Sequence, residues 1–137
     1  MLYNLLISGY DEAWEGNSYK IDRDRCIKVT QYTSREIADK YGSFGNEEIN
    51  ELKTFPCIFA YENRIDKDPY FGYITDIIVR QDGVKITFEK TVMDKFLSYQ
   101  DMNEYRFELD ITEWELNRTH WAIKDVELEN LLQGLGG

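Results

Sequence analysis

The order of apolar and polar positions along the chain predicts several short strands separated by short helices. Continuous apolar stretches at 2–8 and 56–62 are typical of buried strands. Apolar and polar residues alternate over 71–79 and 84–89, and a turn at Gln81-Asp82-Gly83 favours joining these two segments as a hairpin. The same reasoning predicts further strands over 105–111, over 119–123 and within 19–30, mainly at 26–29.

Helix signals fill the segments between these strands. Thr33 and Glu36 have the spacing of a capping box, which predicts a helix that starts there and ends at Gly42. A second helix is expected to begin near Asn46 and to end before Pro56. Two more helices are expected over 92–99 and after Asp125, the last with its apolar stripe at Leu128, Leu131, Leu132 and Leu135.

These elements predict an α+β fold with a strongly bent antiparallel sheet or small β-barrel. Three to four short helices would be inserted between the strands, and a C-terminal helix would follow them. Since no repeat, low-complexity segment or proline-rich linker interrupts the chain, we expect a single domain over residues 1–133. Residues 134–137, Gly-Leu-Gly-Gly, are expected to form a flexible tail and to begin a linker to a further domain.

Composition and charge narrow the classes of function. Hydrophobic residues make up 42% of the 137 residues and aromatic residues 15%, so a well-packed core is expected. The formal net charge of -10 disfavours direct binding to nucleic acid and to anionic membrane surfaces. No basic segment precedes the short N-terminal apolar run, so we predict neither a signal peptide nor a membrane span and expect a cytoplasmic protein.

Cysteine and histidine are too few for a zinc site. The chain has two cysteines, Cys26 and Cys57, and one histidine, His120, whereas such a site needs about four nitrogen or sulfur ligands. Both cysteines lie in apolar stretches, so we expect buried, reduced thiols. Burial would also keep Cys57 inactive as a nucleophile beside His120. Phosphate-binding and dinucleotide-binding motifs are missing as well, and we expect neither metal nor cofactor.

The segment Arg118-Thr119-His120-Trp121 is the first candidate binding site. Arginine offers a planar set of donors, tryptophan a face for stacking, and histidine a donor that changes with pH. Strand alternation predicts that Arg118 and His120 point outward together while Trp121 packs inward. The alternative is a structural corner held by Trp121 packing and by an ion pair of Arg118 with Glu113 or Glu115.

Two further groups of aromatic residues are candidates for recognition. Trp14, like Tyr10, lies in the polar loop 9–18, which favours a contact with another protein or domain. The second group lies around Gly72, which would allow another backbone to approach the tyrosines near it. Cross-strand packing is the alternative for these tyrosines. The second group consists of Tyr61, Glu62, Tyr70 and Tyr73.

Acidic residues are concentrated in the C-terminal third. Residues 91–137 contain ten acidic and four basic side chains, whereas residues 17–30 contain two acidic and four basic ones. The acidic region is interpreted either as a solvated face or as a surface that docks a basic partner or imitates a nucleic acid backbone. Its candidate residues are Glu108, Asp110, Glu113 and Glu115.

Aromatic residues are abundant and no catalytic constellation is evident, which favours a non-enzymatic recognition domain that binds a protein or a small ligand. We expect it to be the N-terminal module of a larger protein of the effector or defence type. One alternative is an acidic inhibitor, of the kind phages use in counter-defence, that blocks a basic groove by imitating nucleic acid. A second alternative is a small enzyme that uses His120 with acidic residues for proton transfer.

Overall fold

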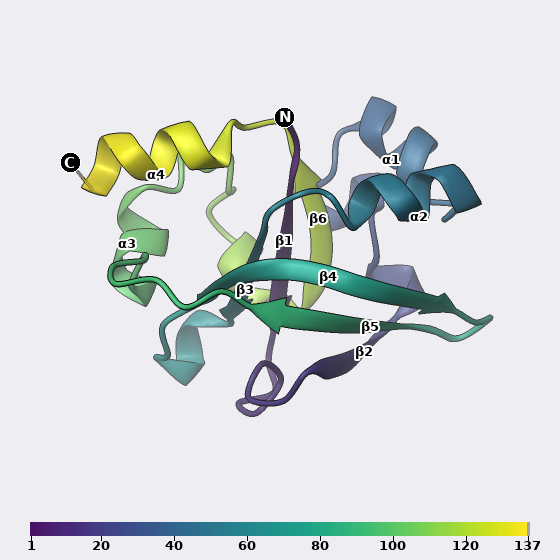
Figure 1. The fold of residues 1–137 in the computed structure, drawn as a ribbon, viewed down its shortest axis with the longest axis horizontal. Coiled ribbons are helices and arrows are strands. Elements are labelled where there is room, and N and C mark those ends of the chain that lie inside the picture. The colour runs from purple at the N-terminus through teal and green to yellow at the C-terminus, as the bar shows by residue number, and fades with distance from the viewer. Residues whose placement is uncertain (137) are drawn as a thin grey trace.

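A six-stranded mixed sheet with the strand order β2-β5-β4-β3-β1-β6 organises the molecule (Figure 1). The computed structural model describes residues 1–136. The strands are β1 (Tyr3–Ser8), β2 (Ser18–Asp22), β3 (Cys57–Tyr61), β4 (Tyr70–Val79), β5 (Gly83–Lys90) and β6 (His120–Lys124). The α-helices are α1 (Arg35–Tyr41), α2 (Asn46–Leu52), α3 (Tyr99–Glu104) and α4 (Leu128–Gly136).

The predicted α+β class is confirmed, but the strongly bent sheet or barrel is wrong. The sheet is open, with β2 and β6 as its edge strands, and it is neither closed nor strongly curled. It is also not purely antiparallel, because β1 and β3 run parallel while every other neighbouring pair is antiparallel. The chain between β1 and β3 carries β2, α1 and α2, which provides the long crossover that a parallel pair needs.

Hydrophobic clusters cover both faces of the central strands. In β1, Leu6 belongs to a first cluster with Trp14 and Trp121, whereas Leu5 and Ile7 belong to a second one. Residues of α1 and α2 join the first cluster, and residues of α3, α4 and the 105–117 segment join the second. Strands covered on both faces read as continuous apolar runs, which explains the sequence of β1 and β3.

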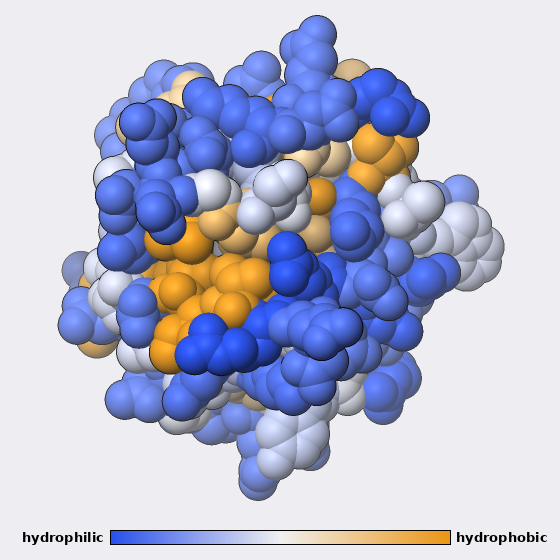
Figure 2. Space-filling view, turned by 90° about the vertical axis from the view of Figure 1, so that its right-hand side faces the viewer, coloured by the Kyte–Doolittle hydropathy of each residue, from blue (hydrophilic) through white to orange (hydrophobic). Residues whose placement is uncertain are grey.

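The side of the molecule that carries α1, α2 and the tip of the β4–β5 hairpin is mostly polar. Figure 2 views this side and shows a large hydrophobic area bordered by polar residues. Three partly buried side chains on these elements pack against the first cluster, namely Ile37 of α1, Ile49 of α2 and Val79 of β4.

The strand predicted over 105–111 is wrong. This segment forms consecutive turns, with backbone hydrogen bonds from Leu109 to Tyr105 and from Ile111 to Arg106. Asp110 has a φ of 60°, a left-handed conformation that regular strands exclude. The alternating apolar residues of this segment are therefore only partly buried: Leu109 and Ile111 are buried, while Phe107 is 90% exposed.

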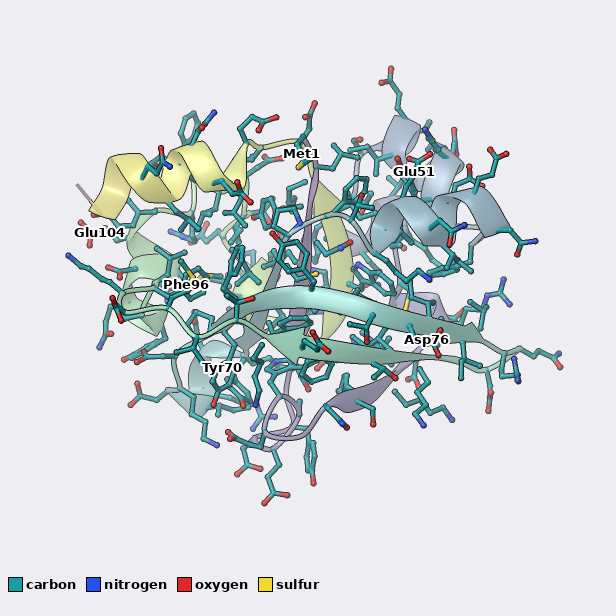
Figure 3. The ribbon with its side chains drawn as sticks, viewed as in Figure 1. Met1, Glu51, Tyr70, Asp76, Phe96 and Glu104 are labelled. Carbon is teal, nitrogen blue, oxygen red and sulfur yellow. The ribbon has the colours of Figure 1, made fainter. Side chains whose placement is uncertain are left out.

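The helix predicted over 92–99 is also wrong, because α3 begins at Tyr99. Ser98 and Asp101 form a reciprocal capping box at this point, with bonds of 3.1 Å and 2.9 Å. Val92 is 97% exposed rather than buried. Phe96, labelled in Figure 3, lies in the non-helical segment, and its ring centroid is 5.6 Å from that of Phe71.

Two predictions for residues 18–36 need correction. The strand expected at 26–29 lies earlier, at β2, and Val29–Gln31 forms a short 3₁₀ helix. The Thr33 hydroxyl does not cap α1, because it accepts a hydrogen bond from the backbone of Ile123 at 3.2 Å. A long-range partner has replaced the local one.

The remaining predicted elements are confirmed within a few residues. The strands expected at 2–8, 56–62, 71–79, 84–89 and 119–123 correspond to β1, β3, β4, β5 and β6, and the helix expected near Asn46 is α2. The final helix begins at Leu128, three residues after Asp125, and it continues through Gly134 to Gly136. Leu128 is buried, Leu131 and Leu132 are half-buried, and the side chain of Leu135 lies outside the described set.

Candidate functional site

The residues of the segment Arg118-Thr119-His120-Trp121 differ in their exposure to solvent. Arg118 is exposed, whereas His120 and Trp121 are both completely buried. The predicted outward orientation of His120 is therefore wrong. All five residues of β6 are buried, because packing covers both faces of this edge strand.

His120 belongs to a buried ionic cluster. Its Nε2 lies 2.8 Å from Oε2 of Glu115, and its Nδ1 lies 2.7 Å from the carbonyl oxygen of Arg118. Lys124 donates to Oε1 of Glu115 at 2.9 Å and to the Tyr32 carbonyl at 2.8 Å. A carbonyl oxygen and a carboxylate oxygen both accept hydrogen bonds, so each ring nitrogen of His120 faces an acceptor.

Trp121 and Trp14 are held on the inside by hydrogen bonds from their indole nitrogens. Trp121 donates to Oδ1 of Asn4 at 3.0 Å, and Trp14 donates to the Ala60 carbonyl at 2.6 Å. The ring of Trp14 also contacts the rings of Tyr19, Phe59 and Phe88. The loop 9–18 therefore folds Trp14 into the first cluster, and this side chain is not displayed for an external contact.

The predicted tyrosine surface is largely engaged within the chain. Tyr61 and Tyr70 both donate to the carboxylate of Glu15, at 3.0 Å and 3.4 Å, and Lys67 approaches the same carboxylate at 3.4 Å. The hydrogen bond from Tyr61 is the main cause of a lowered pKa for the Glu15 carboxyl. Tyr70 is labelled at the start of β4 in Figure 3.

Tyr73 and the neighbouring Gly72 also have partners within the chain. The Tyr73 hydroxyl lies 3.4 Å from Glu129 of α4. Gly72 does allow a close backbone approach, but the neighbour is the chain itself: a Cβ added there would lie 2.1 Å from the carbonyl oxygen of Glu89 in β5. Cross-strand packing therefore accounts for the glycine beside these tyrosines.

Arg118 and Glu62, predicted in separate candidate groups, line the same cavity. Its volume is about 430 Å³, and it lies between one edge of the sheet and the segment that leads into β6. We call this cavity, together with the one that adjoins it, the β2 groove. The first cavity is lined by Tyr19, Lys20, Ile21, Asp22, Arg25, Glu62, Asn117, Arg118 and Thr119.

The adjoining cavity extends the β2 groove towards the hairpin tip. It has a volume of about 450 Å³ and shares Asp22, Arg25 and Arg118 with the first. Its lining adds Gln31, a buried residue whose side-chain oxygen has no hydrogen-bond partner within residues 1–136. The other residues of this lining are Arg23, Asp24, Gln81 and Asp82.

Hydrogen bonds fix the wall of the groove opposite β2. Thr119 donates from its hydroxyl to Oε2 of Glu62 at 2.6 Å and accepts from the Gly9 amide at 2.9 Å. Arg25 donates to the Thr119 carbonyl at 3.0 Å. The ends of β1 and β3 thus position residues 117–119 across from the edge strand.

Charge in the β2 groove is balanced, although the whole chain carries -10. Its three arginines, Arg23, Arg25 and Arg118, have no carboxylate within 4.0 Å in the described part of the chain. Guanidinium groups left without such partners are available to carboxylates or phosphates of a ligand. The four cations of the lining are Lys20, Arg23, Arg25 and Arg118, and the four anions are Asp22, Asp24, Glu62 and Asp82.

Only three of the four residues predicted for the acidic face lie on the surface. Glu115 is completely buried in the cluster with His120 and Lys124, so it cannot form part of a surface. Glu108, Asp110 and Glu113 are exposed. Two exposed aromatic side chains, Phe107 and Trp114, flank these acids in the sequence.

The cysteines behave as buried, free thiols. Cys26 and Cys57 form no disulfide, and burial raises the pKa of each thiol to about 12. Within the described 136 residues, no group of three or more histidine, cysteine or acidic side chains is arranged to hold a metal ion. None of the helices in the same part of the chain combines the length and apolarity that a membrane crossing requires.

Sequence reasoning missed the contribution of residues 22–31 to the groove. Arg23 and Arg25 line it from a 3₁₀ helix, and Gln31 lines it from a second one. The excess of basic residues in 17–30 was a usable signal, but it did not show that this segment lines the same cavities as Arg118. Comparisons with protein-family models, with curated proteins and with solved structures give no match for the chain.

Proposed function

We propose that the chain is a non-enzymatic recognition domain that binds a protein or small ligand in the β2 groove. The observation that carries this proposal is that Arg118 and Glu62 line one cavity with Arg25, while the Arg118 and Arg25 guanidinium groups have no carboxylate within 4.0 Å among residues 1–136. The reduced, buried thiols agree with action in the cytoplasm. Membership in a larger effector or defence protein remains part of this proposal.

The enzymatic alternative receives less support from the geometry. The Glu115–His120 pair resembles an acid–base pair in distance, but both side chains are completely buried. A general acid or base must come within hydrogen-bond reach of its substrate. His120 lines neither cavity of the groove.

The acidic-inhibitor alternative rests on the exposed segment 107–114. Glu108, Asp110 and Glu113 could face a basic partner, and exposed Phe107 and Trp114 would add apolar contact area. Binding of this kind weakens steeply with salt, because the contacts are between exposed charges. The groove remains the first choice because it combines a cavity with arginines that have no carboxylate partner in the part of the chain that the structure describes.

The test is a pull-down from native cell lysate with the wild type, Arg118→Ala and Arg35→Ala. Arg35 is an exposed arginine on α1 and serves as the matched control. We expect a partner that is retained by Arg35→Ala and lost by Arg118→Ala. A partner retained by all three proteins would refute the groove, and its loss at high salt would then favour the acidic segment.

A further inference from the structure

We propose that the ligand of the β2 groove is an extended peptide that adds to the outer edge of β2 as a further strand and places an acidic side chain against Arg118. This inference rests on the proposed recognition function and specifies the class of partner. It depends on the backbone of β2, on the shape of the groove and on its charges.

The register of β2 shows which backbone groups face the groove. Phe88 donates its amide to the Asn17 carbonyl at 2.9 Å, and the paired residues continue as Tyr19 with Ile86 and Ile21 with Val84. Antiparallel strands alternate between hydrogen-bonded and non-hydrogen-bonded pairs. The residues between these pairs therefore direct their amide and carbonyl groups away from β5; they are Ser18, Lys20 and Asp22.

These outward groups are largely free. Within residues 1–136, neither the amide nor the carbonyl of Lys20 has a hydrogen-bond partner outside the β2–β5 pairing, whereas the Asp22 carbonyl accepts from the Cys26 thiol at 3.4 Å. Lys20 itself lines the groove. A row that alternates free donors and acceptors is complementary to another strand.

The charges of the groove favour a peptide over a free anion. An isolated phosphate would use the guanidinium groups but would leave the Lys20 carbonyl unpaired and would lie beside Asp22 and Glu62. A strand satisfies the amide and the carbonyl of Lys20 together, and one acidic side chain on it would reach Arg118 or Arg25. The side-chain oxygen of Gln31, which has no partner within residues 1–136, offers a further acceptor to a donor of the peptide.

The experiment starts from a random dodecapeptide library displayed on phage and selected on the whole chain. The enriched peptides are synthesised, and their affinities are measured by fluorescence polarisation. Each peptide is then N-methylated at one position at a time, which removes a backbone donor from the ligand without changing the folding of the protein. We expect about tenfold weaker binding for N-methylation at every second position and little change between them.

Matched variants of the protein locate the binding edge. Lys20→Pro removes the outward amide, and an edge strand tolerates proline at such a position. Lys20→Ala removes only the side chain. Because both variants lose the lysine side chain, we expect about tenfold weaker binding for Lys20→Pro than for Lys20→Ala, and we expect Arg118→Ala to weaken binding of peptides that carry an acidic residue.

Several results would overturn the proposal. These are a selection that yields no binding peptide, affinities that are indifferent to N-methylation, and sedimentation showing a dimer that Lys20→Pro dissociates, because a second copy would then occupy the edge. If peptide binding is weakened by Arg118→Ala but not by N-methylation, strand addition is refuted while recognition in the β2 groove is still supported. If peptide binding is unchanged by Arg118→Ala and by both Lys20 variants, groove recognition and strand addition are both refuted.

Discussion

Glu115 and His120 form a 2.8 Å hydrogen bond in which neither side chain is exposed to solvent. Lys124 completes the cluster on the other carboxylate oxygen. Glu115 also accepts from the Thr112 amide, so the segment before β6 is tied to the strand itself. The residue that sequence reasoning placed on an acidic surface thus neutralises charge inside the fold.

Replacing Glu115 with alanine is expected to destabilise the protein by about 3–5 kcal/mol, because Lys124 and His120 would be left buried without their anionic partner. The measurement is the free energy of unfolding in urea. Glu113→Ala is the control, since Glu113 is exposed two residues away and its loss should cost less than about 0.5 kcal/mol. Equal costs for the two variants would contradict the buried cluster.

The three tryptophans should respond differently to a quencher. Trp14 and Trp121 are completely buried, whereas Trp114 is 68% exposed. Acrylamide is therefore expected to quench one accessible component of the fluorescence, and Trp114→Phe should abolish that component. If the accessible component persisted in this variant, one of the two other indoles would have to be open to solvent.

Both thiols are expected to resist alkylation in the native protein. Burial raises the pKa of Cys26 and of Cys57 to about 12, so at pH 8 neither forms an appreciable amount of thiolate. Iodoacetamide should leave both unmodified until guanidinium chloride unfolds the chain, after which mass spectrometry should find two modifications. Rapid native labelling of either cysteine would count against its placement.

Tyr61→Phe is expected to raise the pKa of Glu15 towards its ordinary value of 4.5, because the tyrosine hydrogen bond is the main cause of the lowered pKa. A lowered pKa in the folded state contributes stability that is present above 4.5 and lost as the pH falls through the lowered value. The difference in unfolding free energy between wild type and variant should therefore shrink in acid.

The direct measurement is an NMR titration of the Glu15 side-chain carboxyl. Tyr10→Phe is the control, because the Tyr10 hydroxyl bonds Glu12 and not Glu15. An unchanged Glu15 titration in Tyr61→Phe would show that this hydrogen bond does not form in solution.

Local patterns were sufficient for the elements whose partners are close in sequence or whose faces are uniformly buried. The continuous apolar runs predicted β1 and β3, and alternation with an intervening turn predicted the β4–β5 hairpin. The same alternation failed over 105–111, where Asp110 adopts a left-handed conformation and local turns replace a strand. Alternation states which residues prefer burial, but several backbone shapes can bury them.

The sequence by itself determined the α+β class, most strand positions, the buried thiols and the presence of Arg118 and Glu62 among the candidates. Only the tertiary structure decided that β1 and β3 are parallel, that His120 is bonded to Glu115 in the interior, and that Arg118 and Arg25 line the same cavity. These relationships join residues far apart in the chain or depend on which face is covered. They follow from packing between elements, which local residue patterns do not specify.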